Sequence, residues 1–256
     1  MRLNIGCVNV SCMRRGHKRR QRPFTLSIDI GGTSFKASVL DADGKMASEA
    51  VRMETPYPCP PKVMVVALSE LVNPLPKFDR VSVGFPGVVR EGKVLTAPHF
   101  GNRIWRGYPL ADALQKEWRK PVRLLNDADM QGSAVIGGKG LELVVTLGSG
   151  VGTAVFRDGE LMPRLELSQH PVYGARTYNE YIGDRTLKQI GVARWNKRVR
   201  NALGWLQTLL NYDRLYVGGG NARLITFKSG KNTKIVSNRA GVLGGIALWP
   251  QRRKGL

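Results

Sequence analysis

The chain has 256 residues, is 42% hydrophobic, and carries a formal net charge of +21. Its hydrophobic content is ordinary for a soluble globular protein, and no apolar run reaches the roughly 20 residues that a membrane helix needs. The excess of basic residues favours an anionic partner, such as a nucleotide, a polyphosphate or a nucleic acid.

The N-terminal segment is basic. Residues 1–23 contain seven Lys or Arg residues, no acidic residue and no amphipathic period, so we expect a disordered basic arm there and a short basic tail at 250–256. Without these seven residues, 33 basic residues still face 19 acidic ones. Only six residues precede Cys7, and the positive cluster follows the apolar part, the reverse of a signal peptide. We therefore expect a cytoplasmic protein, and its three cysteines fit a reducing compartment.

Regular patterns begin at Phe24. They predict an antiparallel meander over 24–30, 35–40 and 46–53, and then a helix over 63–72, a strand over 81–83, a helix over 110–118, a strand over 122–125 and a helix over 128–136. The second part predicts strands over 143–147 and 152–156, a hairpin at 158–159, a helix with an apolar face from Trp195 to Leu210, strands at 214–217 and 234–236, and a closing helix from about 241.

Paired strands around a glycine turn thus occur twice, each time followed by alternating helices and strands. This repetition predicts an α/β protein with two lobes, each a mixed sheet flanked by helices, and a cleft between them. We expect the N-terminal lobe to span 24–123 and to be joined by the C-terminal helix. The C-terminal lobe would span 124–249.

Three glycine-rich turns follow predicted strands: 29–33 (Asp-Ile-Gly-Gly-Thr), 148–153 (Gly-Ser-Gly-Val-Gly-Thr) and 218–221 (Gly-Gly-Gly-Asn). Glycine lets the backbone approach an anion closely, and the N–H groups of such turns bind phosphate. Asp29 can hold Mg²⁺ through water. Lys36 either reaches a phosphate or faces solvent. A single turn of this kind is weak evidence, since Gly-Gly also occurs in ordinary hairpins.

Six motifs in order resemble the ROK sugar kinases, which have the two-lobed ribonuclease H-like fold of the hexokinase and actin-like ATPase superfamily. They are residues 29–33, 84–87 (Gly-Phe-Pro-Gly), 126–129 (Asn-Asp-Ala-Asp), 147–153, 217–221 and 240–245 (Ala-Gly-Val-Leu-Gly-Gly). The resemblance runs from about residue 24 to 249. Within the family it is greatest to the bacterial polyphosphate glucokinases and glucomannokinases.

The resemblance implies that Asp127 is the general base that receives the proton of a sugar hydroxyl. The alternative is that Asn126 and Asp127 merely cap the helix that follows them. It implies sugar contacts by Asn126, Asp127, Glu166, His170, Asn102, Gly87 and Glu180. It implies phosphate or nucleotide contacts by Asp29, Gly31, Gly32, Thr33, Lys36, Gly148, Ser149, Gly150, Gly218, Gly219, Gly220 and Asn221.

Two sugar candidates have an alternative interpretation from the residues alone: Glu166 as a solvated loop carboxylate and Glu180 as an exposed helix carboxylate. The chain also departs from the family pattern. The stretch 171–185 has no cysteine, which rules out the family's zinc site, and Glu166 and His170 are one residue further apart than in the family motif. No helix-turn-helix segment precedes the kinase motifs, which argues against the family's repressor branch.

The implied reaction transfers a phosphoryl group to the 6-hydroxyl of glucose or mannose, with Mg²⁺ and either inorganic polyphosphate or ATP. A basic run between Arg185 and Arg200 favours polyphosphate, because a long phosphate chain releases counterions from such a surface. A solvated helix face is the alternative. Other hypotheses are an ATP-only hexokinase for glucose, fructose, N-acetylglucosamine or N-acetylmannosamine, and a non-catalytic protein that binds nucleic acid. Family members are often dimers, and the aromatic loop at 104–105 suggests a contact surface.

Overall fold

The structure is a computed structural model that describes residues 22–228, 230–237 and 240–249. The basic arm and basic tail predicted from the sequence lie outside these residues, apart from Arg22 and Pro23. Among the helices of the described part, none combines the length and the apolar character that crossing a bilayer requires.

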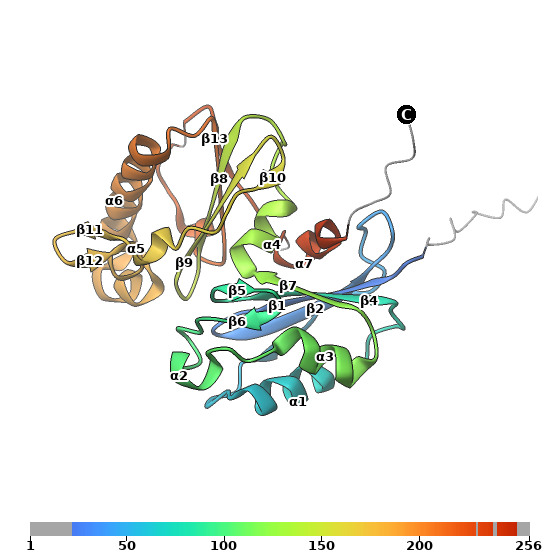
Figure 1. Cartoon of the computed structure of the whole chain (residues 1–256). Helices are drawn as coiled ribbons and strands as arrows, with labels where there is room; N and C mark the ends of the chain where they lie inside the picture. The colour runs from blue at the N-terminus through green and yellow to red at the C-terminus, as the bar shows by residue number, and fades with distance from the viewer. Residues whose placement is uncertain (1–21, 229, 238–239, 250–256) are drawn as a thin grey trace, which may run out of the picture.

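The first sheet has the strand order β3-β2-β1-β4-β7. Its strands are β1 (Thr25–Ile30), β2 (Ser34–Leu40), β3 (Val51–Glu54), β4 (Arg80–Phe85) and β7 (Val122–Asn126). The first three form an antiparallel meander, and β4 and β7 then add in parallel to β1. Helices α1 (Pro61–Val72) and α3 (Leu110–Trp118) cover one face of this sheet (Figure 1).

The third strand begins later than the sequence predicts, at Val51 rather than at residue 46. Met46 makes only an isolated bridge with Leu40. Between them, the hydroxyl of Ser48 accepts a hydrogen bond from Val39 N, and Ser38 Oγ donates to Ser48 O. These side-chain hydrogen bonds replace the regular ladder at this point, which is a known alternative for serine.

A small hairpin and a short helix follow the first two parallel strands: β5 (Val89–Arg90), β6 (Lys93–Val94) and α2 (Asn102–Trp105). Trp105 is fully buried, and its indole N–H donates to Cys59 O at 3.1 Å. The suggestion that 104–105 forms an aromatic contact surface is therefore wrong for the tryptophan, because its ring belongs to the core of this half.

The second sheet has the order β10-β9-β8-β13-β14. Its strands are β8 (Leu141–Leu147), β9 (Val151–Arg157), β10 (Glu160–Leu161), β13 (Arg214–Gly218) and β14 (Thr233–Ile235). Helix α6 (Asp184–Leu210) packs the buried side chains of Trp195 and Val199 against this sheet. The smaller elements are η1 (Leu167–Gln169), β11 (Pro171–Tyr173), β12 (Arg176–Thr177), α5 (Tyr178–Ile182) and η2 (Ala222–Leu224).

Helix α6 is broken at Gly191, whose φ of 74° and ψ of 164° are not helical. The basic run predicted on one surface is therefore divided. Arg185 and Lys188 precede the break, and Arg194, Lys197, Arg198 and Arg200 follow it. Arg198 is half-buried, and its guanidinium lies 4.9 Å from the centre of the Tyr181 ring.

The layer between the two sheets holds α4 (Asp127–Ser133), α7 (Ala240–Leu243) and η3 (Gly244–Leu248) (Figure 1). The C-terminal segment attaches to the first sheet: Ser27 Oγ donates to Val242 O at 2.5 Å, and Ser82 Oγ donates to Gly245 O at 2.7 Å. The chain end thus returns to the strand with which the fold begins. This arrangement places α4 where both sheets can contribute residues around its N-terminus.

Trp249 fixes this returning segment. Its indole N–H donates to Ser82 Oγ at 2.8 Å, and the guanidinium groups of Arg80 and Arg123 lie 5.0 and 4.4 Å from its ring centre. We predict that Trp249→Ala lowers the free energy of unfolding by about 1–3 kcal/mol, because it removes a hydrogen bond and two cation–π contacts. Urea unfolding measures the change.

The control is Leu209→Ala, which removes an exposed apolar side chain from α6 and should change stability by less than about 0.5 kcal/mol. An equal loss in the two variants would show that Trp249 does not hold the C-terminal segment.

Candidate active site

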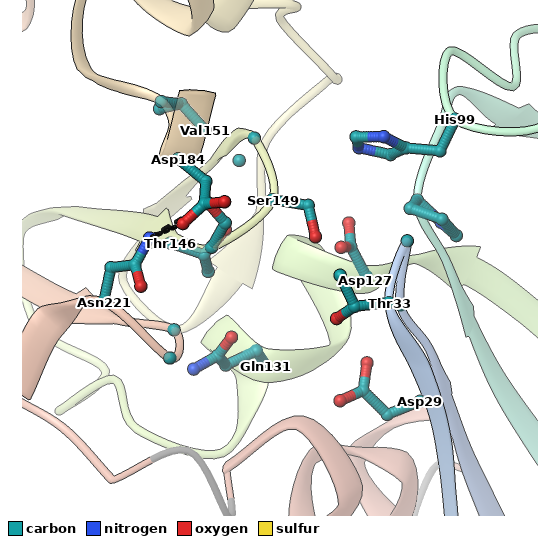
Figure 2. A pocket seen from close by; sticks show the side chains of 18 of the residues that line it. Asp29, Thr33, His99, Asp127, Gln131, Thr146, Ser149, Val151, Asp184 and Asn221 are labelled. Atoms are coloured by element: carbon teal, nitrogen blue, oxygen red, sulfur yellow. Dashed lines mark hydrogen bonds between the residues drawn. The ribbon is translucent and has the colours of Figure 1, made fainter. Parts of the chain in front are cut away.

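A cleft of about 860 Å³ opens between the two sheets (Figure 2). Its walls come from the β1–β2 turn, the β8–β9 turn, the turn after β13 and the N-terminus of α4. These segments are far apart in the sequence, yet they include residues of all three glycine-rich turns: 29–33, 148–153 and 218–221. The cleft therefore brings the glycine turns together at the N-terminus of α4.

Asp127 is the first residue of α4 and faces this cleft, and Asn126 before it is the N-cap. The buried Asn126 accepts from Ala128 N at 2.8 Å and donates to Gly87 O at 3.0 Å. Asn126 thus caps the helix, which was one of the two alternatives for Asn126 and Asp127. A sugar that contacts Asn126 would have to bind the same side-chain amide that makes these hydrogen bonds. Asp127 accepts a hydrogen bond from Ala128 N at 2.9 Å and also lines the cleft. It therefore contacts the start of the helix, as a capping residue would, and is also placed to act in the cleft.

The environment of Asp127 raises its pKa from 3.8 to about 7. Burial is the largest cause, because it disfavours the charged form. The nearby Asp29 carboxylate raises the pKa further, and Arg164 and the Ala128 N–H lower it. A carboxylate with a pKa near neutral is suited to accept a proton at physiological pH.

Arg164 organises the acidic groups at one side of the cleft. Its Nη1 donates to Asp129 Oδ1 at 2.7 Å and to Thr153 O at 3.0 Å, and its Nε donates to Glu166 Oε1 at 2.7 Å. The pKa of Asp129 is nevertheless raised to about 6, since burial outweighs the guanidinium. Glu166 is therefore not a free loop carboxylate, because one of its oxygens is held at the edge of the cleft.

The turn Gly31–Thr33 is held open by hydrogen bonds from outside the hairpin. Thr55 Oγ1 donates to Gly31 O at 2.8 Å, and the hydroxyl of Tyr57 donates to Gly32 O. A Cβ on Gly32 would come within 3.1 Å of His99 and 3.3 Å of Ser149 Oγ. The first two phosphate-type turns therefore approach each other across the cleft, where an anion could contact both.

The turn after β13 closes the other end. Gly219 has φ +87°, a conformation that a residue with a Cβ rarely adopts. Asn221 Nδ2 donates to Gly148 O at 3.3 Å and to Asp184 Oδ1 at 3.2 Å, the latter drawn in Figure 2. Asn221 thus joins the second and third turns. Gly218 differs from its neighbours, because it ends β13 and is not among the residues that line the cleft.

Asp29 and Lys36 stand opposite each other in the β1–β2 ladder, and their charged atoms are 3.6 Å apart. Both line the cleft. Burial raises the pKa of Asp29, and Lys36 partly offsets this. Of the two orientations that the sequence allowed for Lys36, the structure therefore has the one beside Asp29 and the cleft.

The comparison with known proteins adds to this geometry. The model of the ROK family matches residues 25–163, more than half of the chain. The chain belongs to the ROK family. Polyphosphate glucokinases of Mycobacterium tuberculosis and Mycobacterium leprae are 30% and 29% identical to it, over 84% and 90% of the chain and 83% and 75% of their own lengths.

Solved ROK structures have the same fold. The inorganic polyphosphate/ATP-glucomannokinase of Arthrobacter sp. strain KM superposes with a TM-score of 0.80 at 26% identity, covering 88% of this chain and 98% of that one. A ROK family glucokinase of Streptomyces griseus, solved with glucose and AMPPNP, gives a TM-score of 0.72 at 20% identity, with the same coverage of both chains. The two-lobed α/β fold predicted from the sequence is therefore confirmed.

Four residues predicted for the ROK site do not line the cleft: Asn102, His170, Glu180 and Gly218. Glu180 forms a capping box at the start of α5, where its Oε2 accepts from Thr177 N at 2.9 Å. Asn102 accepts from Ala97 N at 2.6 Å and fixes its own loop. His170 is exposed at the end of η1. The structure therefore does not bring these three side chains into the cleft.

The cleft also contains residues that sequence reasoning did not assign to it: His99, Gln131, Arg164 and Asn179. Asn179 lies next to Glu180 and accepts from Val151 N at 2.7 Å, so the capping box turns the amide rather than the carboxylate inward. Gln131 follows Asp127 by four residues, a helical spacing that could have identified it. No sequence signal singled out Arg164.

The raised pKa of Asp127 predicts that the free energy of unfolding depends on pH. Its pKa is higher in the folded protein than in the unfolded chain, so ionisation destabilises the fold as the pH rises from about 4 to about 7. Asp127→Asn cannot ionise. We predict that it is more stable than the wild type at pH 8, by on the order of 3 kcal/mol, and that this gain shrinks towards pH 5.

Urea unfolding at several pH values between 5 and 8.5 tests this, with Asp43→Asn in an exposed turn as the matched control. A gain for Asp127→Asn that stays constant across this range would mean that the carboxyl group ionises at its ordinary pKa.

Proposed function

We propose that this protein is a sugar kinase that transfers a phosphoryl group to the 6-hydroxyl of glucose or mannose, with inorganic polyphosphate and ATP as donors. The observation that carries the proposal is the position of Asp127, which stands in the cleft among the phosphate-type turns with a pKa near 7. The names of the mycobacterial and Arthrobacter relatives support the choice of sugar and donors.

The sugar would lie at the Asp127 end of the cleft. The hydroxyl that attacks the donor transfers its proton to the Asp127 carboxylate, while the bond between the terminal phosphorus and its leaving oxygen breaks. Glu166 can accept hydrogen bonds from sugar hydroxyls through its outer oxygen, with Arg164 holding the other. The backbone at Gly87 lines the same region, tied to Asn126.

The donor would lie along the glycine turns. The turns at 31–33, 148–150 and 219–220 line the cleft, and backbone N–H groups of such turns bind phosphate oxygens. The N–H groups of Gly31 and Gly148 already donate to Ser34 O and Gly150 O, so other N–H groups of these turns would hold the phosphate. The Lys36 ammonium group lies 3.6 Å from the Asp29 carboxylate and also lines the cleft, so it could bind either that carboxylate or a phosphate.

Mg²⁺ fits this donor set, because it prefers one or two carboxylates together with phosphate oxygens and water. Asp29 would hold it through water. The ion supplies charge neutralisation of the phosphate oxygens.

Polyphosphate is favoured by charge outside the cleft. Arg194 and Lys197 are exposed on α6, beyond the part of the helix that reaches the cleft through Asp184 and Lys188. A long phosphate chain could extend from the donor turns over this surface, whereas ATP could not. The hypothesis of a non-catalytic nucleic-acid-binding protein explains the same charge but leaves Asp127 and the three turns without a role.

The donor assay tests the proposal. With glucose and Mg²⁺, we predict phosphorylation from both polyphosphate and ATP, with polyphosphate activity falling more steeply as salt rises, because more ionic contacts are broken. Arg194→Ala/Lys197→Ala should raise the KM for polyphosphate several-fold and leave the KM for ATP unchanged. The charge-matched control is Lys62→Ala/Lys116→Ala, on helices α1 and α3.

Absence of activity with polyphosphate at low salt would remove that donor and leave an ATP-dependent sugar kinase. Absence of activity with both donors, together with tight retention of nucleic acid in a filter-binding assay, would favour the non-catalytic alternative.

Asp127→Asn tests the proposed base. We predict a fall in kcat of about 10²–10⁴-fold with little change in donor affinity, because an amide cannot accept the proton. In the wild type, kcat/KM for the sugar should fall as the pH drops below about 7, since protonation abolishes the base. Asp43→Asn is again the control, and a normal kcat for Asp127→Asn would refute the assignment.

A further inference from the structure

One side chain that lines the cleft carries a polar atom without a hydrogen-bond partner among the described residues. Gln131 is 7% exposed and lines the cleft. Its Nε2 is buried and has no hydrogen-bond partner among the residues that the structure describes. An amide N–H buried without an acceptor costs stability, so such an atom calls for an explanation.

The position of this amide indicates what it faces. Gln131 follows Asp127 by four residues and therefore lies on the same face of α4, one turn further along. In Figure 2 its side chain extends away from Asp29, towards the side of the cleft that holds Asn221. It thus lies between the proposed base and the third glycine turn.

The absence of a side chain at Gly218 leaves space for this amide. A Cβ at position 218 would overlap Gln131 Nε2 and would lie 3.0 Å from a methyl group of Val236. This explains why a glycine stands at 218 although the residue does not itself line the cleft. The first glycine of the turn makes room for the side-chain amide, and the next two face the cleft.

We infer that Gln131 binds the phosphoryl donor, its Nε2 donating a hydrogen bond to a phosphate oxygen near the Gly218–Gly220 turn. This inference rests on the proposed function. A phosphate oxygen is the acceptor that the unpartnered N–H lacks, and a hydrogen bond to a charged acceptor is among the stronger ones. Both ATP and polyphosphate supply such an oxygen.

An uncharged hydrogen-bond donor suits position 131 for an electrostatic reason. A Lys or Arg one turn from Asp127 would stabilise its carboxylate and pull its pKa down from about 7, as an opposite charge nearby does. The amide can hold an anion without adding a charge. Gln131 therefore positions the donor while the proposed base keeps its affinity for a proton.

The test compares wild type with Gln131→Met, which has a side chain of similar length and no N–H donor. Binding of AMPPNP and of a short inorganic polyphosphate is measured by calorimetry with Mg²⁺ and without sugar. We expect Kd to rise about tenfold for both ligands. The Tm of the unliganded variant should equal or exceed that of the wild type, because a buried unpaired N–H has been removed.

Gln131→Glu is the second variant. It keeps the shape of the side chain but replaces the donor with an acceptor that repels phosphate, so the loss of affinity should be larger. The matched control is Gln115→Met on the exposed face of α3. Glucose binding should be unchanged in all variants.

Each other outcome overturns the inference in a recognisable way. Unchanged donor affinity with a lowered Tm would make Gln131 a structural residue only. Weaker binding of AMPPNP alone would place the contact on the nucleoside rather than on phosphate. If the wild type binds neither donor, the proposed function itself fails, and this result is distinct from a failure of the variants.

Discussion

Three carboxylates that are partly or fully withdrawn from water meet at one junction, and the site depends on them. Asp29 is the last residue but one of β1, and Asp127 and Asp129 lie in the first turn of α4. Two of them have a cation: Lys36 is 3.6 Å from Asp29, and Arg164 is 2.7 Å from Asp129. Asp127 has no ion pair within the described residues. Asp29 and Asp127 both line the cleft, and of these two Asp127 is the one without a paired cation among the described residues.

The segment 240–249 packs against the same junction. The backbone of α7 approaches Asp29 so closely that a Cβ on Gly241 would lie 2.6 Å from its carboxylate. This segment excludes water from the far side of Asp29, and Trp249 holds it to the first sheet. Burial by the C-terminal segment is therefore part of the reason why the pKa of Asp29 is raised.

The sequence predicted the fold well, because its strongest signals are local and are repeated. Strands that end in Gly-rich turns were placed nearly correctly at β1, β8 and β13. The errors concern elements whose limits depend on side-chain hydrogen bonds, such as β3, which Ser48 delays. The predicted apolar helical face began at Trp195, after the break of α6 at Gly191, so the turns of α6 that precede Gly191 were not predicted.

The site was predicted less completely, and the reason is physical. Which of two adjacent polar residues turns inward depends on a local choice, as at 179–180, where the capping box takes Glu180 and leaves Asn179 for the cleft. Arg164 acquires its role only through partners 35 residues upstream and two residues downstream. Motif order identified the turns, but it could not supply this network of charges.

The distribution of charge finally bears on the choice of donor. Five basic side chains (Lys36, Arg52, Arg164, Lys188 and Arg223) and four acidic ones (Asp29, Asp127, Glu166 and Asp184) line the cleft. Most of the formal charge of +21 therefore lies outside it. A donor that ends within the cleft meets a nearly balanced set of charges, and only a longer anion extends far enough to meet the surplus. On the proposed function, the cleft would carry out the transfer, and the surface beyond it would decide how strongly a long phosphate chain is held.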